Sequence, residues 1–200
     1  MADIFPTGYF GVKSAVEMMP RLDLEDSTIV VIGCGPVELC AVVAAAALKP
    51  KHLFDVDSVQ ARLDQAGKLG AEPLDFMHDK NGMIDRVKSV TGGRGADIVV
   101  EVVGLSPALR TAFDFVRSFG SIISIGVHNA EVLYLYHVFN WQSTDDVQIP
   151  WSGTEAYNKN VRLQMRRCPV RSIFHEAMEA LEQDQHSLSY IPLLEVPSLI

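Results

Sequence analysis

Residues 28–38 read TIVVIGCGPVE, and this stretch decides the predicted fold. Its first half is a continuous apolar run that ends at a glycine, which is typical of a short strand buried on both faces of a parallel sheet. The residues that follow, 36–48, are rich in Ala, Leu and Val and predict a helix packed under that sheet. The stretch therefore predicts a strand, a glycine turn and a helix in that order.

The rest of the chain continues this alternation. Strands are predicted at residues 52–57, 71–76, 97–103, 121–125 and 161–165, and helices at 58–69 (capped by Ser58), 83–91, 106–119 and 171–183. Such alternation predicts an α/β fold with a doubly wound parallel sheet, the Rossmann fold. Ligands of such sheets bind outside the carboxyl ends of the strands, so the residues that follow strands are the first candidates for a site.

The turn after the first strand carries a dinucleotide motif. Gly33 and Gly35 match the first two glycines of G-x-G-x-x-G, which allow a tight turn and the close approach of a pyrophosphate to the helix N-terminus. Asp57 lies 19 residues beyond Glu38, near the spacing of the acid that binds the adenosine ribose. A carboxylate there favours NAD over NADP. Asp55, two residues earlier on the same strand face, is the alternative ribose acid, but the position of Asp57 at the strand end favours Asp57.

Glu38 replaces the third glycine of this motif. That position normally carries no side chain, because helix and strand pack closely there. Glu38 is either a tolerated variant in a widened turn or a group that weakens dinucleotide binding through its bulk and its like charge. We favour the second interpretation, because both effects act in the same direction.

Composition and charge exclude several classes of protein. The 200 residues are 48% hydrophobic and 21% charged, which excludes intrinsic disorder. A net charge of −8, with no basic stripe, excludes a protein that binds nucleic acid through the phosphate backbone. The longest apolar run, residues 39–48, is too short to span a bilayer, and no secretory signal is visible. The three cysteines do not have the spacing of a zinc site or of a disulfide framework. We expect a cytoplasmic protein.

Several motifs together resemble the cofactor-binding half of the zinc-type alcohol dehydrogenases, members of the medium-chain dehydrogenase/reductase family. They include Val31-Ile-Gly-Cys-Gly-Pro-Val37, Thr91-Gly-Gly-Arg-Gly-Ala-Asp97, Glu101-Val-Val-Gly104 and Arg167-Cys-Pro-Val-Arg-Ser-Ile-Phe174, and matches run nearly from end to end. The resemblance implies an NAD-dependent oxidoreductase that transfers a hydride between a small alcohol or aldehyde and the nicotinamide.

The resemblance also implies roles for single residues. Thr7 would lie near the nicotinamide, Asp57 would bind the adenosine ribose, and Arg62 would flank the adenine. The remaining contacts are implied by position: Gly33, Gly35, Pro36 and Val37 would hold the pyrophosphate, and Val103, Gly104, Gly126 and Val127 would line the nicotinamide half of the site. Asp3 falls where the family places a catalytic-zinc ligand, although a solvated terminal aspartate is the interpretation we favour.

The sequence departs from the family by lacking a preceding catalytic domain with its Cys and Gly-His-Glu zinc ligands. A catalytic zinc takes three protein ligands, so we expect that this chain does not bind zinc and that it is inactive without the zinc-binding domain. The expected organisation is a remnant of the catalytic domain or linker helix (1–26), an NAD-binding Rossmann domain (27–170) and a C-terminal helix and tail (171–200). The alternative function is a truncated, catalytically inactive module for dinucleotide binding or dimerisation.

A few further residues have two interpretations each. Glu101 is an acid–base group or a strand-end carboxylate satisfied by backbone donors; His128 is a proton relay or an ordinary loop histidine. Cys34 is a reactive thiol at a helix N-terminus or a small buried packing residue. We favour the second interpretation of each. Trp141 and Trp151 flank the segment through which the family dimerises, so they predict either a homodimer interface or cover for that sheet edge.

Overall fold

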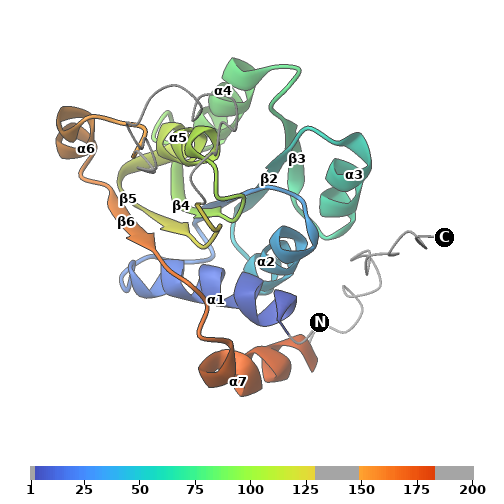
Figure 1. Ribbon diagram of the computed structural model, residues 1–200. Coiled ribbons are helices and arrows are strands. Elements are labelled where there is room, and N and C mark those ends of the chain that lie inside the picture. Colours follow the sequence, from blue (N-terminus) through green and yellow to red (C-terminus); the bar gives the residue numbers. More distant parts are fainter. Residues whose placement is uncertain (1–2, 129–148, 183–200) are drawn as a thin grey trace, which may run out of the picture.

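The structure is a computed structural model, and it describes residues 3–128 and 149–182 (Figure 1). In these ranges the strands form one parallel sheet in the order β3-β2-β1-β4-β5-β6. The strands are β1 (Thr28–Ile32), β2 (His52–Asp57), β3 (Glu72–Asp75), β4 (Ala96–Glu101), β5 (Val116–Ser124) and β6 (Arg162–Met165). The direction of winding reverses between β1 and β4, which confirms the predicted doubly wound sheet and places a crevice at that point.

Helices cover both faces of the sheet (Figure 1). Side chains of α1, α2, α3 and α7 belong to the hydrophobic cluster on one face, and those of α4 and α5 belong to the cluster on the other. The helices are α1 (Ile4–Glu17), α2 (Pro36–Ala47), α3 (Gln60–Lys68), α4 (Lys80–Val90), α5 (Ser106–Phe115), α6 (Gly153–Lys159) and α7 (Val170–Glu182). Among the described residues, no helix has the length and apolar character needed to cross a bilayer.

The position of β1 at the centre of the sheet explains why residues 29–32 are all apolar. Ile29 and Val31 point into the cluster around α2, whereas Val30 and Ile32 point into the cluster around α5. Every residue of β1 is buried, as expected for a strand covered on both faces. The strand therefore places the glycine turn that follows it at the carboxyl end of the central strands.

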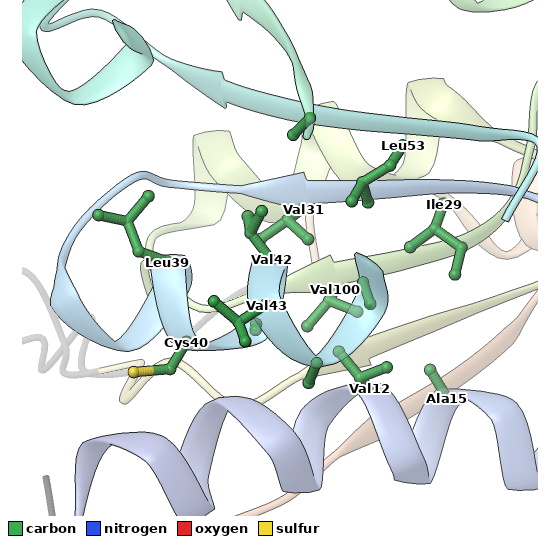
Figure 2. Packing of buried hydrophobic residues seen from close by; sticks show 14 of the residues in the cluster. Val12, Ala15, Ile29, Val31, Leu39, Cys40, Val42, Val43, Leu53 and Val100 are labelled. Carbon is green, nitrogen blue, oxygen red and sulfur yellow. The ribbon is translucent and has the colours of Figure 1, made fainter. Parts of the chain in front are cut away.

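Helix α2 is apolar around most of its circumference because it is itself covered. It packs on β1 and β2 of the sheet and against α1, which contacts β4 and β5 on the same face, and seven of its residues, from Leu39 to Ala45, are buried. Figure 2 shows Val12 and Ala15 of α1 directed towards α2 and the sheet, in the cluster that also holds Val43 and Val100. Helix α1 thus packs directly on the sheet unit, while the predicted division of the chain into domains stays a prediction.

Two of the local differences between prediction and structure concern the ends of helices. Ser58 was expected to cap the helix after β2, but α3 begins at Gln60 with Val59 at its N-cap. The Asp57 carboxylate accepts the backbone N–H groups of Ser58 and Val59 just before the helix, and α3 has no side-chain cap hydrogen bond. The helix predicted to reach residue 119 ends at Phe115, because the chain turns at Val116 to pair with β4.

Candidate functional site

A cleft of about 550 Å³ opens at the carboxyl ends of the central strands. It brings together five residues that the sequence predicted as cofactor contacts: Gly33, Gly35, Asp57, Arg62 and Val103. They come from the ends of β1, β2 and β4 and from α3, so residues 70 positions apart in the chain meet in one cavity. The cleft lies at the crevice that the strand order creates, which is the usual ligand site of a doubly wound sheet.

The glycine turn aims the N-terminus of α2 into this cleft. Gly33 has φ +101°, a conformation that side chains disfavour, and its N–H donates to the Val56 carbonyl across a distance of 2.7 Å. Gly35 is the N-cap of α2, and Pro36 is the first residue of the helix, where its missing N–H costs nothing. The free N–H groups and the dipole of such a helix end favour an anion.

Asp57 has both of its carboxylate oxygens facing backbone donors. Its Oδ1 accepts the N–H groups of Ser58 (2.7 Å) and Val59 (2.9 Å), and its Oδ2 accepts the N–H of Cys34 (2.9 Å). A carboxylate has about four acceptor positions, so about one is left on Asp57. Arg62 approaches the same Oδ2 from the rim of the cleft, with 3.7 Å between Nη1 and Oδ2. Asp57 therefore ties the glycine turn to β2 and keeps capacity for one more donor.

Asp55, the alternative ribose acid, has no access to the cleft. It is fully buried, and its Oδ2 accepts the Cys34 thiol at 3.1 Å. Burial raises the pKa of the Asp55 carboxyl well above its ordinary value of 3.8. Burial, with the charge of Asp55, also raises the pKa of the Cys34 thiol. Cys34 is accordingly a buried packing residue and not a thiolate, as the favoured interpretation predicted.

Glu38 folds back over the glycine turn. An ideal Cβ placed on Gly35 would lie 2.6 Å from Glu38 Oε2, and one placed on Gly33 would lie 3.0 Å from Oε1. The Glu38 carboxylate therefore rests against the two glycines that shape the turn. Burial raises the pKa of this carboxyl above its ordinary value, although a hydrogen bond from its own backbone N–H acts in the opposite direction.

A buried polar network supports the second half of the predicted site. Glu101, at the end of β4, accepts the N–H of Gly104 at 2.6 Å and the hydroxyl of Ser124 at 2.5 Å. The Nε2 of His128 lies 2.7 Å from the Ser124 hydroxyl and 3.3 Å from Glu101 Oε2. Glu101 is thus satisfied within the protein, while the relay hypothesis for His128 stays a prediction. Its Nδ1 has no hydrogen-bond partner among the described residues.

The loops after β4 and β5 touch through their glycines. An ideal Cβ on Gly126 would lie 2.1 Å from the Gly104 backbone nitrogen, and one on Gly104 would lie 2.6 Å from the Val127 carbonyl oxygen. Gly104, Gly126 and Val127 are therefore neighbours, next to Val103 on the cleft wall. The predicted contacts to the nicotinamide form one continuous patch.

Gly104, Gly126 and Val127 do not line the cleft itself, and the other predicted residues also lie outside its wall. Pro36 and Val37 form the first turn of α2, and the Val37 carbonyl faces Gly8 of α1. Thr7 lies in α1, where its hydroxyl donates to the Asp3 carbonyl at 2.8 Å. Asp3 is exposed at the N-cap of α1, and no group of three or more potential metal ligands occurs among the described residues.

Sequence reasoning missed part of the cleft wall. Phe76 and Lys80 follow β3, while Leu105, Pro107 and Thr111 follow β4. The signal was available, because every loop that follows a parallel strand emerges at the same edge of the sheet. Of the two tryptophans, Trp151 stacks on Phe113 with 4.5 Å between ring centroids, whereas Trp141 lies outside the described residues.

The chain is similar in sequence to known proteins. The sequence model of a family described as zinc-binding dehydrogenase matches residues 36–180. Zinc-type alcohol dehydrogenase B of Aspergillus flavus is 50% identical over 191 residues, which are 96% of this chain and 41% of the relative. Medium chain reductase/dehydrogenase ucsI of Acremonium sp is 55% identical over 130 residues, covering 65% of this chain and 44% of that protein. The chain spans about two fifths of the length of these curated relatives.

Solved structures share the fold. An alcohol dehydrogenase from Thermus sp. ATN1 aligns with a TM-score of 0.74 and 25% identity, over 92% of this chain and 46% of that chain. An alcohol dehydrogenase from Thermotoga maritima aligns with a TM-score of 0.75 and 21% identity, over 94% of this chain and 47% of that chain. In both cases the match covers a little under half of the solved chain.

Proposed function

Because this chain belongs to the zinc-binding dehydrogenase family, we propose that its cleft binds NAD for an alcohol dehydrogenase-like oxidoreductase. Membership confirms the resemblance drawn from the sequence motifs. The reaction would transfer a hydride between a small alcohol or aldehyde and the nicotinamide. This chain would supply the cofactor platform of that reaction.

The observation that carries the proposal is the hydrogen bond between Asp57 and the glycine turn. The N–H of Cys34, in the middle of the turn, donates to Asp57 at 2.9 Å, so a direct hydrogen bond links the candidate ribose acid to the turn before α2. The one acceptor position left on Asp57 fits a ribose hydroxyl. The residues present therefore fit the adenosine half of a dinucleotide, and the fit is disturbed at Glu38, whose carboxylate rests on the turn.

The cleft and the loops beside it each have a role in this proposal. Asp57 would accept a ribose hydroxyl, the N-terminus of α2 would face the pyrophosphate, and Arg62 would flank the adenine at the rim. The loops of Gly104 and Gly126 would position the nicotinamide, with Glu101 holding the Gly104 N–H in place. NAD itself supplies the hydride acceptor when bound, and the protein supplies its position.

Zinc does not fit the described residues. A catalytic zinc takes three protein ligands, and Asp3 has no second or third metal-ligating side chain grouped with it in the described part of the chain. We therefore derive no step through zinc from these residues.

A second candidate function is a non-catalytic module that binds a dinucleotide weakly or not at all. The observation that favours it is again Glu38, because a carboxylate on the glycine turn opposes the pyrophosphate. Binding measurements separate the two candidates, since the first requires saturable binding of the cofactor to the cleft.

Asp57 provides the test of the cofactor assignment. We expect the chain to bind NADH at least about tenfold more tightly than NADPH, because the 2′-phosphate of NADPH would meet the Asp57 carboxylate. In the variant Asp57→Asn this preference should shrink severalfold, since the charge is removed and the side-chain size is kept. Titrations followed by tryptophan emission and by calorimetry measure both affinities. Equal affinity of the natural chain for the two cofactors would refute the role given to Asp57.

A further inference from the structure

Glu38 occupies the place at which the glycine turn would receive a pyrophosphate. A Cβ on Gly35 would collide with the Glu38 carboxylate, and one on Gly33 would lie 2.9 Å from Glu38 Cγ and 3.0 Å from its Oε1. This carboxylate also accepts a hydrogen bond from its own backbone N–H, in the first turn of α2. This is the kind of donor that a bound phosphate uses at a helix N-terminus. The Glu38 carboxylate therefore lies where a bound pyrophosphate would place its negative charge.

The surroundings of Glu38 are mixed in charge. Asp57 from β2 and Glu101 from β4 repel its carboxylate, and Arg62 from α3 attracts it. Lys80 from α4 lines the same cleft. Other titratable groups near it are buried: Asp55, Cys34 and Cys40. A pyrophosphate placed on the turn would add negative charge directly against the Glu38 carboxylate, and the two cations are at the rim.

We propose that the Glu38 carboxylate is an internal substitute for the pyrophosphate, so that a pyrophosphate ligand enters the cleft together with one proton, which Glu38 takes up from solvent. The inference rests on the proposed dinucleotide site and adds that the charge of Glu38 controls which ligands bind there. Ligands that carry the pyrophosphate compete with the carboxylate, whereas adenosine, which has no phosphate, does not. Glu38 is then the residue that decides which adenosine ligands the cleft accepts at a given pH.

The sign of the pH dependence follows from the protonation state. Below the pKa of Glu38 the group is neutral and its proton is already in place, so binding of the pyrophosphate is tightest there. As the pH rises through this pKa, which burial has raised, the affinity falls, by at most about tenfold per pH unit for one proton. The affinity for adenosine stays constant across the same range.

The experiment is calorimetric titration of the full chain with ADP-ribose and with adenosine, between about pH 5.5 and about pH 8.5. ADP-ribose is chosen because its pyrophosphate has no group that titrates in this range. Titrations in two buffers with different heats of ionisation count the protons taken up. The matched variant is Glu38→Gln, which keeps the shape of the side chain without its charge, and Glu38→Gly removes the side chain.

The expected result is that ADP-ribose binds the natural chain with uptake of up to one proton and with an affinity that falls as pH rises. Glu38→Gln should show neither effect, and Glu38→Gly should bind ADP-ribose about tenfold or more tightly than the natural chain at the alkaline end. A pH-independent affinity for the natural chain, or a pH dependence that persists in Glu38→Gln, would overturn the inference. If folded Glu38→Gly binds neither ligand at any pH, the proposed function itself fails.

Discussion

Gly8→Ala is expected to lower the free energy of unfolding by about 2–4 kcal/mol, because the added methyl group meets backbone atoms that have no room to move. Gly8 lies in α1 where this helix crosses α2. An ideal Cβ on it would lie 2.5 Å from the Ala41 nitrogen and 2.7 Å from the Val37 oxygen. Thermal unfolding followed by circular dichroism should show a midpoint about 5–10 °C lower.

Gly67→Ala is the matched control. Gly67 also lies inside a helix, α3, but an ideal Cβ on it has no atom within 4 Å. The better helix propensity of alanine should therefore raise the stability by about 0.5–1 kcal/mol. Unchanged stability in Gly8→Ala would mean that α1 does not pack on α2 as closely as the structure has it.

Gly126→Ala is expected to weaken NADH binding by about 10–100-fold while changing the affinity for ADP-ribose by less than about threefold. The added Cβ would lie 2.1 Å from the nitrogen and 2.5 Å from the Cα of Gly104. The two loops must therefore separate, and the predicted nicotinamide patch is broken. Asp57 and the glycine turn, which we propose hold the adenosine half, come from other strands.

The ratio of the two affinities is the readout, because a loss of folded protein lowers the apparent affinity for both ligands alike. Gly153→Ala serves as the control, since an ideal Cβ there also has no atom within 4 Å and the residue lies in α6, outside the cleft wall. Parallel loss of NADH and ADP-ribose affinity in Gly126→Ala would contradict the assignment of these loops to the nicotinamide.

The sheet and the position of the proposed adenosine half of the site were open to prediction because they depend on local patterns. An apolar run that ends in a glycine and an acid at the end of the next strand predict β1, the turn and Asp57, and the structure places all three in one cleft. The strand-end position favours Asp57 over Asp55, but the pattern does not show why Asp55 cannot reach the cleft. Asp55 faces Cys34 inside the protein, and a single strand cannot show this.

Other features depend on contacts between distant segments. The close approach of Gly104 and Gly126, and the network of Glu101, Ser124 and His128, arise because β4 and β5 are neighbours in the sheet. The early end of α5 follows from the pairing of Val116 with Ala96, which overrides the helical pattern that continues to residue 119. The sequence also does not show that the Glu38 side chain lies against Gly33 and Gly35, because this depends on how the folded turn packs.

The measurement that tests the central claim most directly is amide hydrogen exchange of the full chain with and without saturating NAD, read by mass spectrometry at peptide resolution. The account predicts slower exchange in the glycine turn and the first turn of α2 (33–38), after β2 (57–59) and after β4 (103–105), because these segments form the cleft. Unchanged exchange in all three segments of the folded chain, or slowing confined to the opposite edge of the sheet near Arg21 and Arg162, would contradict a dinucleotide site in this cleft.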